Sequence, residues 1–447
     1  MMFRRKIYDD LKQWKDTKAG KHALLIEGAR RVGKSTIIEE FVRNEYRSYI
    51  LIRFEKVGRN IKNLFEDLGD LDRFFLYLQQ YTGVMLYERQ SAIVFDEVQL
   101  FPLARQSIKV LLEDGRYDYY ETGSLISIKK NVQNILIPSE EDTMHMYPMD
   151  FEEFLWARGE ETVMPFIRKA FESQTPLGTD MHEHLIRFYR TYMIVGGMPQ
   201  AIQALNDNNS FSSAEDAKRT ILDLYIKDAS KLDKGSDMVN VSALLRNLSS
   251  NLERHEKTFS PGSVKKGIGM RELQRSIDDL GESMMVNLCY RITEPSVDQY
   301  GHFDPSVLKI YMNDTGLLLT QSFSSSEKNK EEIYNSLLEG DLDVNEGMYF
   351  ENMVAQELRM SGHGLFFSRF KHNDSEKLQE IDFIITRDGS PVPIEVKSGK
   401  RSSQHRSLDR FMDMYGSKVG RPFVIHSKDL RVGEDATYIP IYMASLL

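Results

Sequence analysis

The sequence predicts an α/β protein of several domains, with a parallel sheet near its N-terminus. Its 447 residues are more than a single hydrophobic core usually accommodates. The apolar run at 22–27 precedes a glycine-rich turn, and apolar residues then recur at 37, 38, 41 and 42, which predicts a strand, a loop and a helix. Near the other end, the apolar runs IDFII and PIEVK flank an Asp-Gly turn within 380–400, as expected of two paired strands. Two separate α/β regions are therefore expected.

The turn after the first strand matches the phosphate-binding consensus G-x-x-x-x-G-K-[ST] at every position. In such a loop, backbone N–H groups surround the phosphates and the helix N-terminus adds a favourable dipole. Lys34 is expected to reach the β- and γ-phosphates, and Ser35 to ligate Mg²⁺. The expected nucleotide-binding residues are Gly28, Ala29, Arg30, Arg31, Val32, Gly33, Lys34, Ser35 and Thr36.

Two further strand ends carry residues suited to nucleotide hydrolysis. In SAIVFDEVQLFP (91–102), four apolar residues precede Asp96, which is expected to hold Mg²⁺ through water, and Glu97, expected to orient and deprotonate the attacking water. The run 117–128 predicts a third strand whose end offers the hydroxyls of Thr122 and Ser124 to the γ-phosphate, although an ordinary strand-end turn is the alternative. Such ends meet at the carboxyl edge of a parallel sheet. The sequence thus predicts a protein that binds and hydrolyses ATP with Mg²⁺.

With these motifs the sequence resembles the prokaryotic predicted ATPases of the AAA+ superfamily that carry a C-terminal nuclease-like domain of unknown function. Besides GARRVGKST, VFDEVQ and ETGS, the resemblance rests on YPMDFEEFL (147–155), VGGMPQAI (195–202), YIKDASK (225–231), NDTGLL (313–318) and YFENMVAQEL (349–358). It implies an N-terminal ATPase module, a helical and winged-helix middle, and a C-terminal domain similar to the restriction-endonuclease fold.

One departure from the family pattern concerns an arginine. Family members often have a Gly-Arg pair shortly before the proline-aromatic stretch, and residues 134–151 contain none. If that arginine acts on the γ-phosphate, another residue must replace it, or hydrolysis is slow. Arg105 and Arg116 are the candidates, because they flank the helix expected between the second and third strands.

The motifs and helical spacings give the expected domain boundaries. They are 1–155 for a P-loop AAA+ ATPase domain, 156–234 for a helical lid, 235–320 for a winged-helix-like domain, 321–346 for a solvated linker and 347–447 for a restriction-endonuclease-like domain. A winged helix can place one helix in a DNA major groove. The segment 252–275 holds six basic and three acidic residues, an excess that leaves DNA contact and protein docking equally open.

A second set of candidate catalytic residues lies near the C-terminus. Strand alternation puts Glu395 and Lys397 on one face, Asp382 begins the neighbouring strand, and Glu351 lies on an amphipathic helix upstream. These four residues match the D-x(n)-E-x-K pattern of restriction-like nucleases. Glu351, Asp382 and Glu395 would hold one or two Mg²⁺ ions, and Lys397 would position or activate water. Salt-bridged Glu-x-Lys pairs are also common on strands, so phosphodiester cleavage stays open.

The charge distribution limits how the chain could bind DNA. The net charge of −9 argues against a protein that coats DNA generally. Residues 397–431 nevertheless contain a basic patch, which suits a phosphate backbone or is a solvated helix face. Its members are Lys397, Lys400, Arg401, Arg406, Arg410, Lys418, Arg421, Lys428 and Arg431, against three aspartates.

The remaining composition bears on the compartment. The single cysteine, Cys289, excludes an internal disulfide and fits a reducing environment, as a small buried hydrophobe. No segment approaches ~18 uninterrupted apolar residues, and the N-terminus lacks the apolar run of a signal peptide. A cytoplasmic protein without a membrane span is expected, with its oligomeric state open.

Two functions remain in competition. In the first, the nucleotide state controls the winged helix and nuclease-like region, which act on DNA. In the second, the protein is an ATP-dependent protein-interaction switch or scaffold without nuclease activity. Salt-sensitive DNA binding separates them, because several phosphate contacts make affinity fall steeply with salt.

Overall fold

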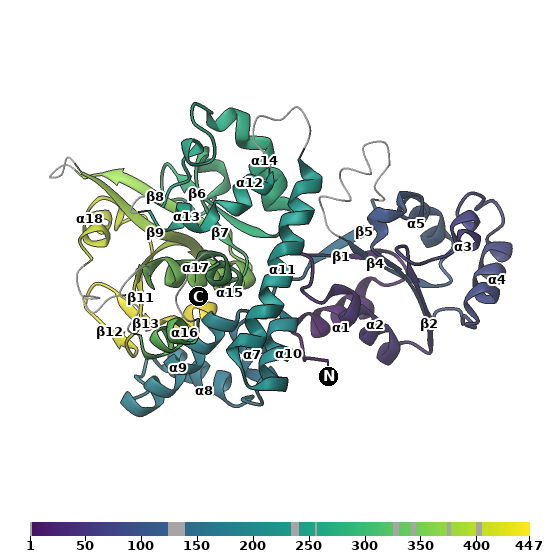
Figure 1. The fold of residues 1–447 in the computed structure, drawn as a ribbon, viewed down its shortest axis with the longest axis horizontal. Helices are drawn as coiled ribbons and strands as arrows, with labels where there is room; N and C mark the ends of the chain where they lie inside the picture. Colours follow the sequence, from purple (N-terminus) through teal and green to yellow (C-terminus); the bar gives the residue numbers. More distant parts are fainter. Residues whose placement is uncertain are drawn as a thin grey trace. The chain divides into compact units, whose positions relative to one another are not determined.

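The computed structural model describes residues 2–123, 139–233, 241–254, 257–324, 330–340, 346–372, 377–398 and 405–447. The chain divides into two compact units, Met1–Tyr147 and Pro148–Leu447 (Figure 1). No helix among these described residues is long and apolar enough to cross a membrane.

The N-terminal unit is built on a five-stranded parallel sheet, as the sequence predicts. Its strands lie in the order β2-β3-β4-β1-β5, so that β4 is inserted between β1 and β3. The strands are β1 (Ala23–Glu27), β2 (Ser48–Arg53), β3 (Ser91–Asp96), β4 (Asp118–Gly123) and β5 (Glu141–His145). The helices are α1 (Ile7–Lys18), α2 (Lys34–Glu45), α3 (Arg59–Leu64), α4 (Leu71–Thr82) and α5 (Pro102–Asp114).

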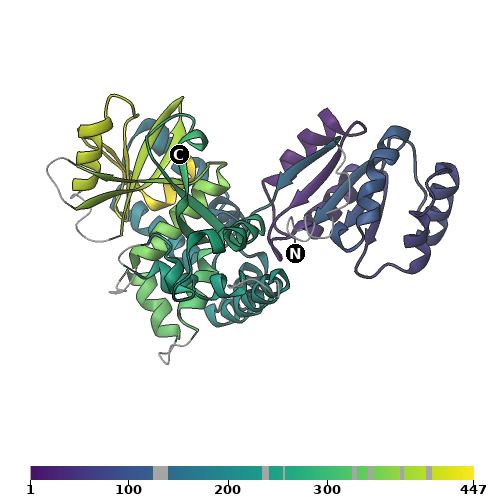
Figure 2. The same ribbon diagram turned by 90° about the horizontal axis from the view of Figure 1, so that it is seen from above.

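Helices cover both faces of this sheet, which is why β1 and β3 are continuous apolar runs (Figure 2). On one face, side chains of α3, α4 and α5 pack with Leu25, Phe95 and Tyr119 in a single core. On the other face, Tyr120 of β4 contacts Trp14 of α1 and Phe41 of α2 edge-on. The sheet is therefore a rigid platform for the loops at its carboxyl edge.

The second unit begins with helices, as the apolar spacing of 151–234 predicts. They are α7 (Phe151–Ala157), α8 (Val163–Ser173), α9 (Thr179–Val195), α10 (Pro199–Asn208) and α11 (Phe211–Leu232). Later helices are α12 (Val241–Arg246), α13 (Leu248–Leu252), α14 (Met270–Glu282), α15 (Thr315–Ser322), α16 (Lys330–Glu339), α17 (Glu346–Met360) and α18 (Arg406–Tyr415).

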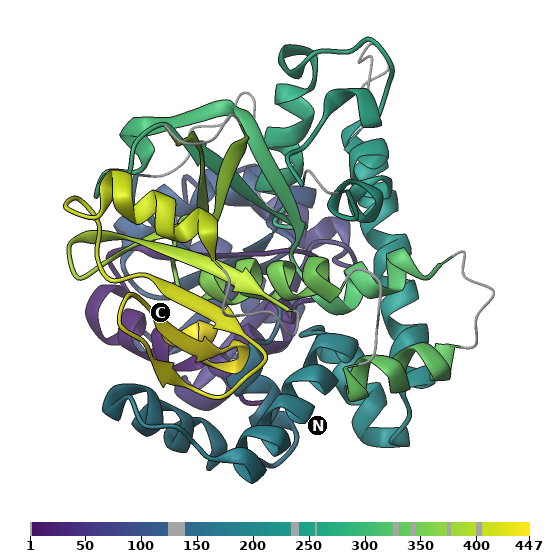
Figure 3. The same ribbon diagram turned by 90° about the vertical axis from the view of Figure 1, so that its left-hand side faces the viewer.

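This unit also contains a mixed sheet, drawn in green and yellow in Figure 3. The sheet has eight strands in the order β12-β13-β11-β10-β9-β8-β6-β7. Its strands are β6 (Val286–Ile292), β7 (Phe303–Met312), β8 (Phe366–Lys371), β9 (Leu378–Arg387), β10 (Ser390–Lys397), β11 (Phe423–His426), β12 (Arg431–Val432) and β13 (Thr437–Pro440). A C-terminal α/β domain is thus confirmed.

The strands of this sheet do not respect the predicted boundary after residue 320. β6 and β7, assigned above to a winged-helix-like domain, join the C-terminal sheet because β6 pairs in parallel with β8, Tyr290 opposite Phe366. The predicted linker 321–346 also differs, since it contains α16, which buries Ile333, Tyr334 and Leu337. That spacing is helical, and the surrounding polar residues obscured it in the sequence.

The short runs that carry the family resemblance in this unit meet in one buried network. Asp314, from NDTGLL, accepts a hydrogen bond from Gly197 N of VGGMPQAI (2.5 Å), and Gly197 O accepts one from Met149 N (2.7 Å). Gln356 of YFENMVAQEL accepts from Thr315 N (2.9 Å). Gly196 has φ +79°, and a Cβ there would collide with the Asp314 carboxylate. These runs therefore hold helices and sheet together.

Candidate functional sites

The glycine-rich loop has the backbone that phosphate binding requires. It connects β1 to α2, with φ of 106° at Gly33 and 70° at Arg31. A Cβ on Gly28 would collide with the carbonyl oxygen of Met146. Lys34 is only 6% exposed, and its Nζ donates to the carbonyl oxygens of Gly28 and Ala29, both at 2.9 Å. The loop thus folds around the lysine ammonium.

The predicted strand ends converge beside this loop. Asp96, the last residue of β3, accepts on Oδ1 the hydroxyls of Ser35 and Thr122, each at 2.6 Å. Because β3, β4 and β1 follow one another in the parallel sheet, the side chains at and just after their carboxyl ends share one edge of it. A hydroxyl and a carboxylate oxygen are hard donors of the type that Mg²⁺ takes, so the residues fit this cation.

Glu97 lies at the turn that follows β3. Its φ of 55° is left-handed, which is costly for a residue with a side chain and occurs preferentially at functional sites. Its backbone N donates to Thr122 Oγ1 (3.1 Å), and its carboxylate accepts from the Gln99 side chain. Thr122 thus connects Asp96 and Glu97. The remaining predicted residue, Ser124, lies outside the described residues.

The two candidate replacement arginines have other partners. Arg105 is 4% exposed and pairs with Glu141 at 2.5 Å, with Glu121 at 3.9 Å. Arg116 pairs with Asp114 and Asp72 and precedes β4, so it lies at the edge of the sheet opposite the glycine loop. Neither arginine is therefore placed to act on the γ-phosphate. Arg105 is held by buried carboxylates, and Arg116 lies at the amino end of its strand, away from the glycine loop.

The structure adds two arginines that the sequence motifs do not indicate. Arg53 ends β2 in register with Asp96, and its Nε lies 3.9 Å from Asp96 Oδ2 while its Nη2 bonds Glu39 at 2.5 Å. Arg5 donates to the carbonyl oxygens of Val32, within the loop, and Tyr147, each at 2.8 Å. Strand order alone points to Arg53; nothing in the sequence marks Arg5.

The C-terminal set also comes together, but around lysines. Glu351 is 2% exposed and accepts from Lys309 Nζ (3.0 Å), Tyr311 Oη (2.5 Å) and Lys257 Nζ. Burial acts to raise the pKa of Glu351, but the ammonium groups of Lys257 and Lys309 outweigh it and hold this pKa below its usual range.

The other three predicted residues lie on β9 and β10. Asp382 Oδ2 accepts from Val396 N (2.8 Å), and Lys397 donates to Glu395 at 2.5 Å. Burial raises the pKa of Asp382, with a further contribution from the charge of Glu351. Burial, and then the charge of Asp382, raise the pKa of Glu395.

These residues do not fit the predicted metal centre. Among the described residues, no group of three or more His, Cys, Asp or Glu side chains is arranged to hold a metal ion. Instead, the ammonium of Lys309, a residue with 0% exposure, lies between the carboxylates of Glu351, Glu380 and Asp382.

The predicted basic patch is partly used inside the unit. Arg421 donates to the carbonyl oxygen of Ala436 (3.1 Å) and to Thr437 Oγ1 (3.0 Å), and Arg431 stacks on Tyr438. Lys400 and Arg401 lie outside the described residues. Arg421 and Arg431 nevertheless stay exposed, so their positive charges remain at the surface.

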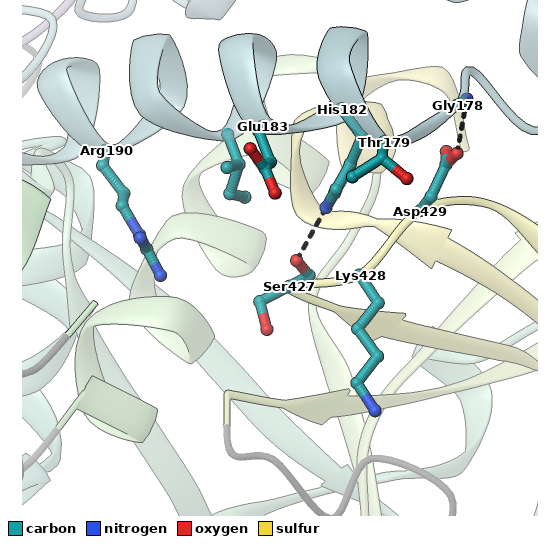
Figure 4. A pocket seen from close by; sticks show the side chains of 9 residues that line it. Gly178, Thr179, His182, Glu183, Arg190, Ser427, Lys428 and Asp429 are labelled. Carbon is teal, nitrogen blue, oxygen red and sulfur yellow. Dashed lines mark hydrogen bonds between the residues drawn. The ribbon is translucent and has the colours of Figure 1, made fainter. Parts of the chain in front are cut away.

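A hollow of about 480 Å³ lies between α9 and the loop after β11 (Figure 4). Asp429 accepts from Gly178 N (2.9 Å) at the start of α9, and His182 Nε2 lies 3.0 Å from Ser427 O. Arg190, which donates to Leu338 O (3.2 Å), lines the hollow from the helix. Both signs of charge line it, and its contacts join α9 to the C-terminal strands.

Three family descriptions match consecutive parts of the chain. Residues 20–155 match an AAA domain. Residues 186–328 and 346–444 match two different domains of unknown function. The AAA match covers the loop, Asp96, Glu97 and Thr122, and it supports nucleotide binding and hydrolysis by this module. No curated protein matches the chain.

Solved structures give weaker similarities. A signal transduction ATPase with numerous domains and a tetratricopeptide repeat sensor, from Pyrococcus horikoshii, is 12% identical with a TM-score of 0.29, over 80% of this chain and 48% of its own. This chain thus spans about half the length of that protein. Cdc6p from Pyrobaculum aerophilum is 13% identical with a TM-score of 0.25, over 74% and 92%. A Vibrio cholerae protein is 13% identical with a TM-score of 0.17, over 89% and 95%.

Proposed function

We propose that the N-terminal unit hydrolyses ATP with Mg²⁺ at the carboxyl edge of its parallel sheet. The observation that carries this proposal is the chain of hydrogen bonds Ser35–Asp96–Thr122, next to a glycine loop that already encloses the Lys34 ammonium. A phosphate-binding lysine, a cation-ligating pair and an acidic residue at a strained turn are the parts that phosphoryl transfer needs.

Each residue has a distinct task. Lys34 exchanges its bonds to the loop carbonyls for bonds to phosphate oxygens, which neutralises negative charge. Ser35 and Asp96 would hold Mg²⁺, which would supply positive charge to the phosphates when bound. Glu97 orients a water and accepts its proton as the oxygen attacks phosphorus and the bond to ADP breaks. Thr122 fixes Asp96 and the Glu97 backbone relative to each other.

This chain lacks the Gly-Arg pair of the similar ATPases, and Arg53 supplies a cationic side chain in its place. It lies beside Asp96 through the β2–β3 register, and its side chain is 44% exposed. Its present partner, Glu39, is a surface residue of α2, and surface ion pairs are weak enough to exchange for a phosphate contact. We assign Arg53 to stabilising negative charge on the γ-phosphate.

Steady-state ATP hydrolysis, with nucleotide binding measured separately, tests this proposal. Lys34→Ala is expected to lose binding and turnover together. Arg53→Ala is expected to lower kcat more than it changes nucleotide affinity, and Arg43→Ala, on the exposed surface of α2, serves as the matched control. Turnover by Lys34→Ala at the rate of the unmodified protein would refute the site.

For the second unit, we propose the role of an ATP-dependent protein-interaction switch. One observation favours this role over DNA cleavage: lysine ammonium groups are ion-paired with Glu351 and Glu395, two of the predicted metal ligands. DNA binding measured at increasing salt tests it. Tight binding that weakens steeply with salt would favour the DNA-directed alternative instead.

A further inference from the structure

We infer that Lys309 takes the place of the divalent cation in the C-terminal sheet, so that a fold patterned like a metal-dependent nuclease has a permanently ion-paired centre. The inference concerns the second unit alone and does not depend on ATP hydrolysis in the first. It rests on the position of the Lys309 ammonium group.

Three carboxylates from two strand positions and one helix surround this group. Lys309 Nζ lies 2.7 Å from Glu380 Oε1, 3.0 Å from Glu351 Oε1 and 3.9 Å from Asp382 Oδ1. β7 provides the lysine, α17 provides Glu351, and β9 provides the other two carboxylates. Several carboxylates converging on one point are what a divalent cation requires, and here the point is filled by a side chain of the protein itself.

The surrounding carboxyl groups already have cationic partners. Glu351 also receives Lys257, Glu380 also receives Arg369 at 2.9 Å, and Glu395 receives Lys397 at 2.5 Å. The cluster thus contains four carboxylates, at 351, 380, 382 and 395, and four cationic side chains, at 257, 309, 369 and 397. A divalent cation added here would meet a buried ammonium of like charge, which low local polarity makes strongly unfavourable.

The two lysines that pair with Glu351 differ in how exposed their side chains are. Lys257 is 24% exposed on its side chain and can turn into solvent. Lys309 is fully buried in a strand of the sheet and also lies over the ring of Phe367. Release of Lys257 therefore does not open a cation site, because Lys309 remains. Metal exclusion is a property of the folded unit.

A titration with Mn²⁺ tests the inference directly. The probe is Mn²⁺ alone, followed by its electron paramagnetic resonance signal, on the full chain carrying Asp96→Asn to remove the first unit's contribution. The expected result is no stoichiometric Mn²⁺ binding up to millimolar concentration. One bound Mn²⁺ per chain that disappears on adding Glu395→Gln overturns the inference, and this arm needs no change at Lys309.

Removing the ammonium gives the complementary arm. Lys309→Met, in the same background, keeps most of the stem and removes the ammonium that lies between the three carboxylates, so that they can move together around a cation; the variant is expected to gain Mn²⁺ binding and a Mn²⁺-dependent rise in Tm. Lys257→Met is the matched control and should gain neither, because Lys309 stays in place. A folded Lys309→Met that binds no Mn²⁺ would show that these carboxylates are not arranged for a cation, which also overturns the inference.

Discussion

Replacing Thr122 with valine tests the hydrogen-bond chain at the nucleotide site with little change of shape. Thr122 is completely buried, and its hydroxyl donates to Asp96 at 2.6 Å and accepts from Glu97 N at 3.1 Å. Valine has nearly the same volume, so the packing of β4 is retained. The variant loses the link between the Mg²⁺-binding carboxylate and the backbone that positions the proposed base.

The size of the effect follows from the bonds that are lost. A hydrogen bond to a charged group contributes about 1.5–3 kcal/mol. Since about 1.4 kcal/mol corresponds to tenfold in rate, kcat for ATP should fall about 10- to 150-fold. The hydrogen bonds of the Thr122 hydroxyl go to Asp96 and to Glu97 N and not to the glycine loop, and therefore KM should change much less.

A coupled assay of ATP hydrolysis by Thr122→Val measures this effect, with Thr143→Val as the control. Thr143 lies on β5 of the same sheet and is exposed, so its variant should behave like the unmodified protein. Equal kcat values for the two variants would refute the role given to Thr122. A large rise in KM with unchanged kcat would place Thr122 in nucleotide binding instead.

Three further predictions concern supports of the fold. Arg5→Ala removes the hydrogen bonds to two backbone carbonyl groups, one of them in the glycine loop, so KM for ATP should rise about tenfold. An unchanged KM would show that Arg5 does not support the loop. Asp314→Ala leaves two buried backbone N–H groups without an acceptor, so the free energy of unfolding measured in urea should fall by about 2–6 kcal/mol. A decrease near zero would show that Asp314 does not hold these segments together. Burial, with nearby cations, lowers the pKa of His426 in the folded protein to about 4, from its usual ~6.5. As the pH falls, the unfolded chain therefore takes up a proton on His426 before the folded chain does. The neutral ring therefore contributes fully to the free energy of unfolding above pH ~6.5, and this contribution falls by at most about 3 kcal/mol as the pH is lowered toward 4. Urea unfolding of His426→Gln should not show this decrease. If the variant and the unmodified protein had the same pH dependence, His426 would not be its source.

The nucleotide site could be predicted because its signals are local. The glycine spacing, the apolar strand before Asp96 and the strand before Thr122 each need only a few neighbouring residues. Their convergence follows from the rule that parallel strands end at the same edge of a sheet. Arg53 follows from the same rule once β2 is known to lie next to β3, but the sequence does not give strand order.

The C-terminal cluster shows where local patterns fail. The sequence places Glu351, Asp382, Glu395 and Lys397 correctly in one neighbourhood. It does not reveal that Lys309, on a strand assigned to another domain, reaches the same point. A lysine within a strand is ordinarily expected to face solvent, and only the pairing of β6 with β8 brings its strand into this sheet. Residues distant in the chain therefore change what the predicted D-x(n)-E-x-K residues can do chemically.

Glu97→Gln tests the proposed ATPase centre most directly, when ATP affinity and ATP turnover are both measured on the same samples of this variant and of the unmodified protein. The glycine loop and Asp96 are unchanged in this variant, so it should bind ATP normally. Its turnover should fall by a factor of about 100 or more, because general-base catalysis typically contributes 10²–10⁴. Turnover equal to that of the unmodified protein would contradict the account of this site as an ATPase centre with Glu97 as its base.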